Sequence, residues 1–171
     1  MSPLDLQQFV PSHVCLKCDG CCRFKTADSS WRPKVGQEEK AKIGMAAGAD
    51  FTDAQAYIKT IEDCGNQLCR FFNKGDSTCQ IYDRRPLECA LYPFILSKHA
   101  QGVQVYVHLA CPYIQDHQSD VALENYIDYL RTFFAAEGTR DFLRKNRGLL
   151  HDYTPFDMEL KFLFTLEGFV L

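Results

Sequence analysis

The sequence predicts a small α+β fold, in which an irregular cysteine-rich part with short strands is followed by C-terminal helices. Apolar residues alternate with polar ones from Val103 to Leu109, which is the period of a β-strand. From Ser119 to about Glu137 the apolar residues fall mostly on one helical face. Because 171 residues suit one domain, we expect a cysteine-rich region over 1–118 and a helical region over 119–171 that packs on it within the same domain.

The first third of the chain offers weaker structural signals. Residues 1–14 are expected to form an unstructured lead-in. A helix is expected over 37–47, because acidic residues come first, lysines follow, and Gly48 lies near its end. A second helix is expected over 52–61, because Thr and Asp at its start are common helix caps.

Two hairpins are expected in the middle of the chain. The pair Gly75-Asp76 marks a turn between residues 69–72 and residues 79–82. The alternating strand is expected to pair with residues 94–96 across a turn near Gln101-Gly102.

The C-terminal part is expected to be helical. Gly138 is expected to end the long amphipathic helix, since glycine is a common helix terminator. A shorter helix is expected from about Arg140 to Arg147. The aromatic and apolar tail after Tyr153 has no clear period, so its structure stays open.

Composition excludes several classes of protein. The apolar fraction of 46% and the charged fraction of 24% are typical of globular proteins. No segment approaches the roughly 18–20 apolar residues of a membrane span. The net charge of −3 shows none of the basic surplus of nucleic-acid-binding proteins. Residues 1–13 lack the pattern of a secretory signal, so we expect a cytoplasmic protein that binds neither nucleic acid nor membrane.

Cysteine is the unusual feature of the composition, with nine residues in the chain. A secreted disulfide-bonded protein is normally shorter, carries a signal and uses an even number of cysteines. In a reducing compartment thiols stay free unless something binds them. Metal binding is the simplest explanation, because thiolate sulfur is a soft ligand that suits zinc and iron–sulfur centres.

The densest motif is Cys15-x-x-Cys18-x-x-Cys21-Cys22. Zinc knuckles use cysteine pairs at this spacing, and three cysteines at successive two-residue spacings match the start of a bacterial-type iron–sulfur loop. Gly20 is expected to supply a left-handed conformation in a crowded loop. Because neighbouring side chains tend to point apart, Cys21 and Cys22 are expected to serve different sides of the site.

Five further cysteines lie too far apart to form a local loop, and they can converge only through the fold. They are Cys64, Cys69, Cys79, Cys89 and Cys111. Several cations flank the cysteines and would stabilise thiolates there, unless they are simply solvated surface charges: Lys17, Arg23, Lys25, Arg70, Arg84 and Arg85.

Two other features near the cysteines are candidates for supporting roles. Pro86 is expected to start a helical turn that aims Cys89 inward, while Arg85 is expected to pair with a sulfur or a carboxylate. His108, near Cys111, is the best histidine candidate for a metal ligand, although a lone histidine is more often a surface or core residue.

These cysteine runs resemble the CxxCxxCC, or YkgJ-type, family of cysteine-cluster proteins, which is described as zinc- or iron-chelating. The resemblance covers roughly residues 15–112 and includes the runs Cys69-Arg-Phe-Phe, Cys79-Gln-Ile-Tyr-Asp-Arg-Arg-Pro-Leu-Glu-Cys89 and Tyr92-Pro93-Phe94. It implies eight metal ligands: Cys15, Cys18, Cys21, Cys22, Cys69, Cys79, Cys89 and Cys111. Cys64 and the region after residue 118 fall outside the pattern, and Cys111-Pro112 replaces a Cys-Gly that the family often has.

Three functions fit the sequence. The first is an iron–sulfur protein with a redox or regulatory role and a protein redox or substrate partner; its cofactor is expected to be a 4Fe-4S cluster. The triple spacing, the distant Cys-Pro and the adjacent thiol pair favour this multinuclear centre. The second is a zinc-chelating structural or adaptor module. The third is a cluster-dependent methyl- or group-transfer enzyme, which a thermal shift with S-adenosylmethionine would test.

Overall fold

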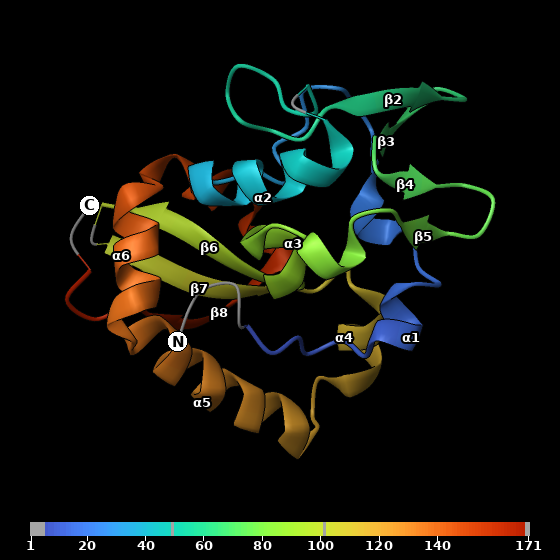
Figure 1. Ribbon diagram of the computed structural model, residues 1–171. Coiled ribbons are helices and arrows are strands. Elements are labelled where there is room, and N and C mark those ends of the chain that lie inside the picture. The colour runs from blue at the N-terminus through green and yellow to red at the C-terminus, as the bar shows by residue number, and fades with distance from the viewer. Residues whose placement is uncertain (1–5, 49, 101, 170–171) are drawn as a thin grey trace. The chain divides into compact units, whose positions relative to one another are not determined.

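A computed structural model of the protein describes residues 6–48, 50–100 and 102–169 (Figure 1). It confirms the predicted α+β fold, with short helices and small antiparallel sheets. The chain divides into two compact units, one of Val10–Ala90 and one of Leu91–Leu171 with Met1–Phe9. The division into regions 1–118 and 119–171 stays a prediction. Within the described ranges, no helix combines the length and apolar character of a membrane span.

The unit Val10–Ala90 contains two small sheets. Strands β1 (Arg23–Phe24), β3 (Asn66–Cys69) and β2 (Thr60–Asp63) form an antiparallel sheet in that order. Strands β4 (Phe72–Asn73) and β5 (Thr78–Cys79) form the predicted hairpin, in which Phe72 lies opposite Cys79. Each of these strands has four residues or fewer, so the unit depends on contacts other than long strand pairing.

The described part of the same unit contains five short helical segments. They are α1 (Ser12–Cys15), the 3-10 turn η2 (Gly20–Cys22), α2 (Gln37–Ala47), the 3-10 turn η3 (Tyr82–Arg84) and α3 (Leu87–Leu91). The predicted helix over 37–47 is confirmed by α2. The predicted lead-in is wrong where α1 begins at Ser12, and its first five residues lie outside the described part of the chain.

The predicted helix over 52–61 is wrong. Thr52 instead forms a bridge with Ile58, and the segment continues into β2. The carboxylate of Asp53 accepts the backbone N–H groups of Gln55 and Tyr57 at 3.0 and 2.9 Å. Such local side-chain hydrogen bonds offer the backbone an alternative to the helix, so Asp53 forms a turn rather than a cap.

A hydrophobic core underlies the cysteines of this unit. Its buried residues are Phe24, Val35, Ile43, Phe51, Ile58, Cys69, Phe71 and Ile81. Cys22 and Cys79 pack against this core from partly buried positions. Cys69 therefore belongs to the apolar interior, while Cys22 and Cys79 lie at its border.

The other unit contains the sheet β6 (Phe94–His99), β7 (Gly102–His108) and β8 (Leu160–Thr165). The predicted hairpin of β6 and β7 is confirmed, with Ile95 opposite Tyr106, although residue 101 of its turn lies outside the described residues. Strand β8 comes from the tail that had no clear period. It pairs with β7, and the two strands, which are far apart in sequence, join because the chain returns to the sheet after three helices.

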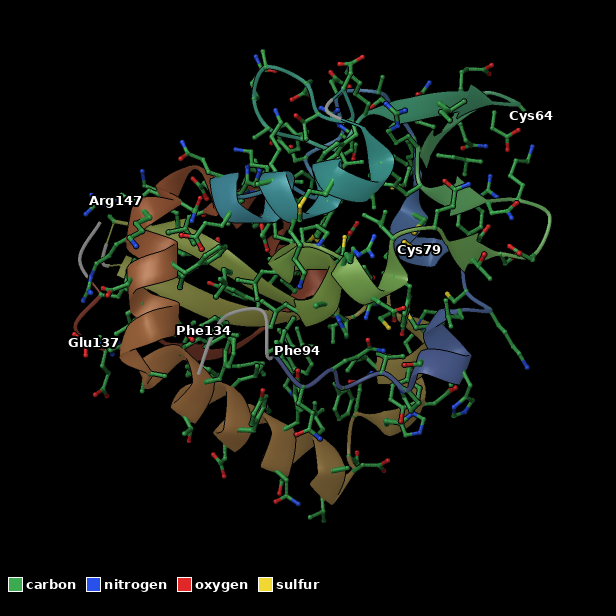
Figure 2. The ribbon with its side chains drawn as sticks, in the orientation of Figure 1. Cys64, Cys79, Phe94, Phe134, Glu137 and Arg147 are labelled. Carbon is green, nitrogen blue, oxygen red and sulfur yellow. The ribbon has the colours of Figure 1, made fainter. Side chains whose placement is uncertain are left out.

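Those helices are α4 (Pro112–His117), α5 (Val121–Ala135) and α6 (Glu137–Lys145), followed by the 3-10 turns η4 (Arg147–Leu149) and η5 (Thr154–Glu159). The long amphipathic helix is confirmed by α5, which packs Tyr126 on Phe94 with a ring separation of 5.0 Å. Figure 2 shows Phe94 and Phe134 between α5 and the sheet, where both are buried.

The predicted end of the long helix at Gly138 is wrong. The chain turns at Ala136, whose backbone is extended, and Gly138 lies in the first turn of α6. The carbonyl of Ala136 accepts the N–H groups of Thr139 and Arg140, and the Arg140 guanidinium donates to the carbonyl of Phe134. These contacts give hydrogen-bond donors to the carbonyls of Phe134 and Ala136 at the junction of α5 and α6, so no left-handed glycine is required there.

Candidate metal centre

The N-terminal cysteine motif folds into two short turns. Cys15 ends α1, Cys18 follows in a loop, and Cys21 and Cys22 lie in η2. The Cys18 N–H donates to the Cys15 carbonyl at 3.2 Å, and the Gly20 N–H lies 3.5 Å from the Cys18 sulfur. The expectation of a left-handed Gly20 is wrong, since its φ is not positive. These local hydrogen bonds stabilise the loop that carries the four cysteines of the motif.

The adjacent thiols Cys21 and Cys22 do not point apart as expected. Their side chains share a hydrogen bond, which lowers the pKa of Cys21 and raises the pKa of Cys22. Both residues belong to the 3-10 turn η2, so the two thiols come from one short segment. Their serving different sides of a metal site stays a prediction.

Three cysteines from later in the chain join this group. Cys69 ends β3, Cys79 ends β5, and Cys89 lies in α3. The charge of Cys21 acts on each of the other members and raises their pKa values. We call this set the thiol group; it consists of Cys15, Cys21, Cys22, Cys69, Cys79 and Cys89.

The thiol group has the electrostatics of a cation site. Burial is the main cause that raises the pKa of Cys69 to about 12, and it also raises the pKa of Cys15, Cys79 and Cys89. Because thiolates that repel one another in a desolvated place are unstable alone, these thiols are protonated at neutral pH in the absence of a cation. A bound metal ion or cluster would supply the missing positive charge, so a soft all-sulfur donor set fits zinc or iron.

Arg85 supplies a fixed positive charge beside the thiol group. Its Nη1 atom lies 3.6 Å from the sulfur of Cys15, which confirms the expected contact with a sulfur. The guanidinium also lowers the pKa of Cys21 and Cys79. Pro86 begins the turn that leads into α3, with its carbonyl accepting the Ala90 N–H at 3.0 Å.

Two carboxylates support the segment that carries Cys89: Glu39, which is buried and was not predicted from the sequence, and Glu88, which is partly buried. Glu39 accepts the N–H of Gly36 at 2.7 Å and the N–H of Leu87 at 2.6 Å. Glu88 accepts the N–H of Lys34 at 2.7 Å, and loss of solvation raises its pKa to about 8. A glutamate at the third position of a helix is a known capping signal and could have identified Glu39.

Two predicted ligands, Cys18 and Cys111, are not members of the thiol group as defined above, and Cys64 lies outside the predicted ligand set. Cys18 has its sulfur near the Gly20 N–H. Cys111 is buried and precedes α4 in the other compact unit. Cys64 is exposed, and Figure 2 shows it at the end of the β2–β3 hairpin, away from Cys79. Across the part of the chain that the structure describes, no three His, Cys, Asp or Glu side chains have the spacing of a finished metal site.

His108 is engaged in hydrogen bonds of its own. Its Nδ1 atom lies 3.1 Å from the hydroxyl of Tyr92, and its Nε2 atom lies 3.3 Å from the carboxylate of Glu159. Burial lowers the pKa of this imidazole. Both ring nitrogens therefore have partners within the same unit, as expected for a structural histidine.

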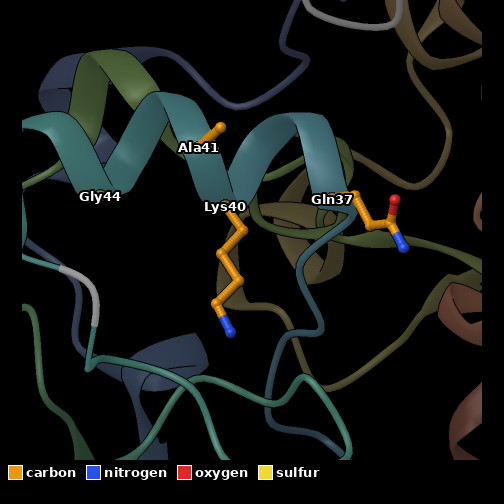
Figure 3. Close-up of a pocket in the computed structure, with 4 residues that line it drawn as sticks. All are labelled: Gln37, Lys40, Ala41 and Gly44. Carbon is orange, nitrogen blue, oxygen red and sulfur yellow. The ribbon is translucent and has the colours of Figure 1, made fainter.

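A separate hollow lies beside α2, and its lining is unlike that of the thiol group. Figure 3 shows the four residues that line it, Gln37, Lys40, Ala41 and Gly44. None of them is a metal ligand of the soft class.

A comparison with known families supports the chemistry of the thiol group. The family described as "CxxCxxCC: Putative zinc- or iron-chelating domain" matches residues 14–118, which is more than half of the chain. This range includes every member of the thiol group and also Cys111. Neither a curated protein nor a solved structure matches the chain.

Proposed function

Because the chain belongs to the CxxCxxCC family of zinc- or iron-chelating domains, we propose that it is an iron–sulfur protein with a redox or regulatory role. The cofactor is a 4Fe-4S cluster, which supplies one-electron chemistry when bound. The protein works in the reducing cytoplasm and exchanges electrons or signals with a protein partner.

The observation that carries this proposal is the number of thiols with which Cys21 interacts. Its charge acts on five other thiols, which come from the N-terminal motif, the β3–β5 segment and α3. A closed zinc site needs only four thiolates, and two such sites would divide the cysteines into separate groups. This gathering of thiols supports metal binding, and because zinc and a 4Fe-4S cluster both take four thiolates, it is the successive two-residue spacings of Cys15, Cys18 and Cys21 that favour the cluster.

The proposed ligands come from the eight cysteines of the family pattern. They are Cys15, Cys18, Cys21, Cys22, Cys69, Cys79, Cys89 and Cys111. The thiol group supplies the first candidates, because its members already interact with one another. Cys18 and Cys111 are proposed on the family pattern alone, and single serine variants test them through the iron that each variant retains.

One anaerobic preparation tests the cofactor. We expect brown protein with acid-labile sulfide, a broad visible absorption band and an electron-paramagnetic signal on reduction or oxidation. Elemental analysis of the same sample should give iron rather than zinc. Colourless protein filled with zinc, from cells that were not starved of iron, would contradict the iron–sulfur proposal.

A zinc-chelating module is the second candidate, because the matched family is described for either metal and the donor set is sulfur alone. Zinc would be held in closed sites of four thiolates and would have a structural or adaptor role. This alternative predicts about two zinc ions per chain, and cooperative loss of structure on chelation. A chain that keeps its fold after complete metal removal would count against it.

A further inference from the structure

Two contacts with Tyr82 hold the Arg85 side chain in place, independently of its contact with Cys15. Its guanidinium lies over the ring of Tyr82, 3.7 Å from the ring centroid, and its Nε donates to the Tyr82 carbonyl at 2.9 Å. Stacking and the backbone hydrogen bond together fix the plane of the guanidinium. The positive charge therefore has a set position that binding of a metal does not need to create.

The same guanidinium also contacts the thiol group. Nη1 lies 3.6 Å from the sulfur of Cys15, a residue 70 positions away in sequence. The cation and this thiol thus come from two separate segments of the chain.

We propose that Arg85 compensates the negative charge of the thiolate–metal centre and thereby sets how tightly this site holds its metal. The inference rests on the proposed function only in that these thiols bind a metal. A zinc ion or an iron–sulfur cluster with four or more thiolates has a net negative charge, which is costly in a desolvated place. A pre-fixed guanidinium that donates to one thiolate offsets part of that cost without further ordering.

Arg84 provides a matched control in the preceding position. Its side chain is exposed, and its backbone N–H donates to the Ile81 carbonyl within η3. Replacing Arg84 by Gln removes the same formal charge one residue away. A difference between the two variants therefore reports the placement of the Arg85 guanidinium rather than the net charge of the chain.

The test is a titration of the reduced, metal-free full chain with Co²⁺ under anaerobic conditions, in competition with a chelator of known affinity. We expect R85Q to bind Co²⁺ about tenfold more weakly than the unaltered chain, which is the usual cost of losing an outer partner of a metal ligand. R85K should lie between the two, because it keeps the charge without the planar fork. R84Q should change the affinity by less than about twofold.

The cobalt spectrum separates this role from a purely structural one. A thiolate that accepts a hydrogen bond from guanidinium holds its electrons more tightly, so R85Q should shift the thiolate-to-cobalt band to longer wavelength. Equal affinities of R85Q and the unaltered chain would overturn the inference, and so would weaker binding with an unchanged band. If R85Q fails to fold by circular dichroism, R85K is judged by the same two criteria. Absence of any thiolate-to-cobalt band in the unaltered chain would instead reject metal binding by these thiols.

Discussion

At the scale of single residues, Cys21 and Cys64 represent the two situations of cysteine in this chain. Cys21 shares a hydrogen bond with Cys22 and acts electrostatically on thiols from three segments. Cys64 is exposed at a hairpin turn with a φ of 50°. The two residues belong to the same compact unit, which makes them a matched pair for substitution.

Replacing Cys21 by Ser is expected to lower metal affinity by more than about tenfold, because it removes the thiol that interacts with every other member of the thiol group. Replacing Cys64 by Ser should leave the metal content unchanged. Metal per chain after identical anaerobic purification, followed by chelator competition, measures both effects. Equal metal loss in the two variants would show that the grouping around Cys21 is wrong.

The raised thiol pKa values predict a pH dependence of metal binding. Burial raises the pKa of Cys69 to about 12 and also raises those of Cys15, Cys79 and Cys89, so the metal-free thiols hold their protons at pH 7. A metal must displace these protons, and binding is therefore favoured as the pH rises. We expect the apparent affinity to fall by at least about tenfold for each pH unit between pH 8 and pH 6.

Proton release measures this directly. Calorimetric titration with Zn²⁺ or Co²⁺ in buffers of different ionisation enthalpy gives the number of protons displaced per metal bound. More than one proton per metal at pH 7 is the expected outcome. An affinity that does not change between pH 6 and pH 8 would mean that the ligands are already thiolates in the metal-free chain.

At the scale of elements, Glu39 connects the starts of two helices. Its carboxylate accepts one N–H at the start of α2 and one at the start of α3, and the residue is only 2% exposed. These two N–H groups are among those that a helix leaves without an internal partner. Glu39 therefore positions the helix that carries Cys89, although it is 50 residues away in sequence.

Replacing Glu39 by Gln is expected to lower the free energy of unfolding by about 1–3 kcal/mol, because the amide nitrogen cannot accept a hydrogen bond and one buried N–H loses its partner. Glu38 is exposed in the same helical turn, so E38Q is the matched control and should change stability by less than about 0.5 kcal/mol. Urea unfolding of both variants at the same metal content measures the difference. Equal stability of E39Q and E38Q would exclude this bridging role.

At the scale of the whole molecule, the two compact units depend on different stabilising contacts. The unit of Leu91–Leu171 with Met1–Phe9 has a three-stranded sheet and a long helix that bury aromatic side chains such as Phe94 and Phe133. The unit Val10–Ala90 has strands of two to four residues and cysteines in or against its core. Metal coordination is therefore expected to contribute more to the stability of the second of these units.

Metal removal should consequently loosen the two units unequally. We expect amide protons of β1, β3 and β5 to lose hydrogen-exchange protection after chelation, while those of β6 and β7 keep theirs. Exchange measured by mass spectrometry on loaded, stripped and reloaded protein tests this, and reloading controls for irreversible damage. Equal loss of protection in both sheets, or in neither, would contradict a local role of the metal.

Three elements are predicted correctly from signals that lie within a few residues of sequence. The helix α5 and the hairpin of β6 and β7 follow from periodicity, because each buries one face of a regular segment. The helix α2 follows from its acidic first turn, the lysines after it and Gly48 near its end. The nature of the candidate site also follows from local sequence. Thiols at spacings of two residues define the chemistry of the ligands before any fold is known.

The errors arise where side-chain contacts override the local pattern. Asp53 caps a turn instead of a helix, because its carboxylate bonds the backbone two and four residues on. The long helix ends at Ala135 rather than at Gly138, because the chain turns at Ala136 and the Arg140 guanidinium donates to the Phe134 carbonyl. Helix propensity alone cannot predict these contacts, since they depend on the orientation of a single side chain in the folded chain.

The sequence by itself determines the cysteine spacing, the helical and strand periods and the family pattern. Each of these depends on residues that are a few positions apart. Only the tertiary structure decides three other features. It groups Cys69, Cys79 and Cys89 with Cys21. It also places the Arg85 guanidinium beside Cys15 and buries Glu39. These contacts join residues separated by 48 to 70 positions or come from several short strands. No local period encodes such distances, so packing of the whole unit decides which thiols meet.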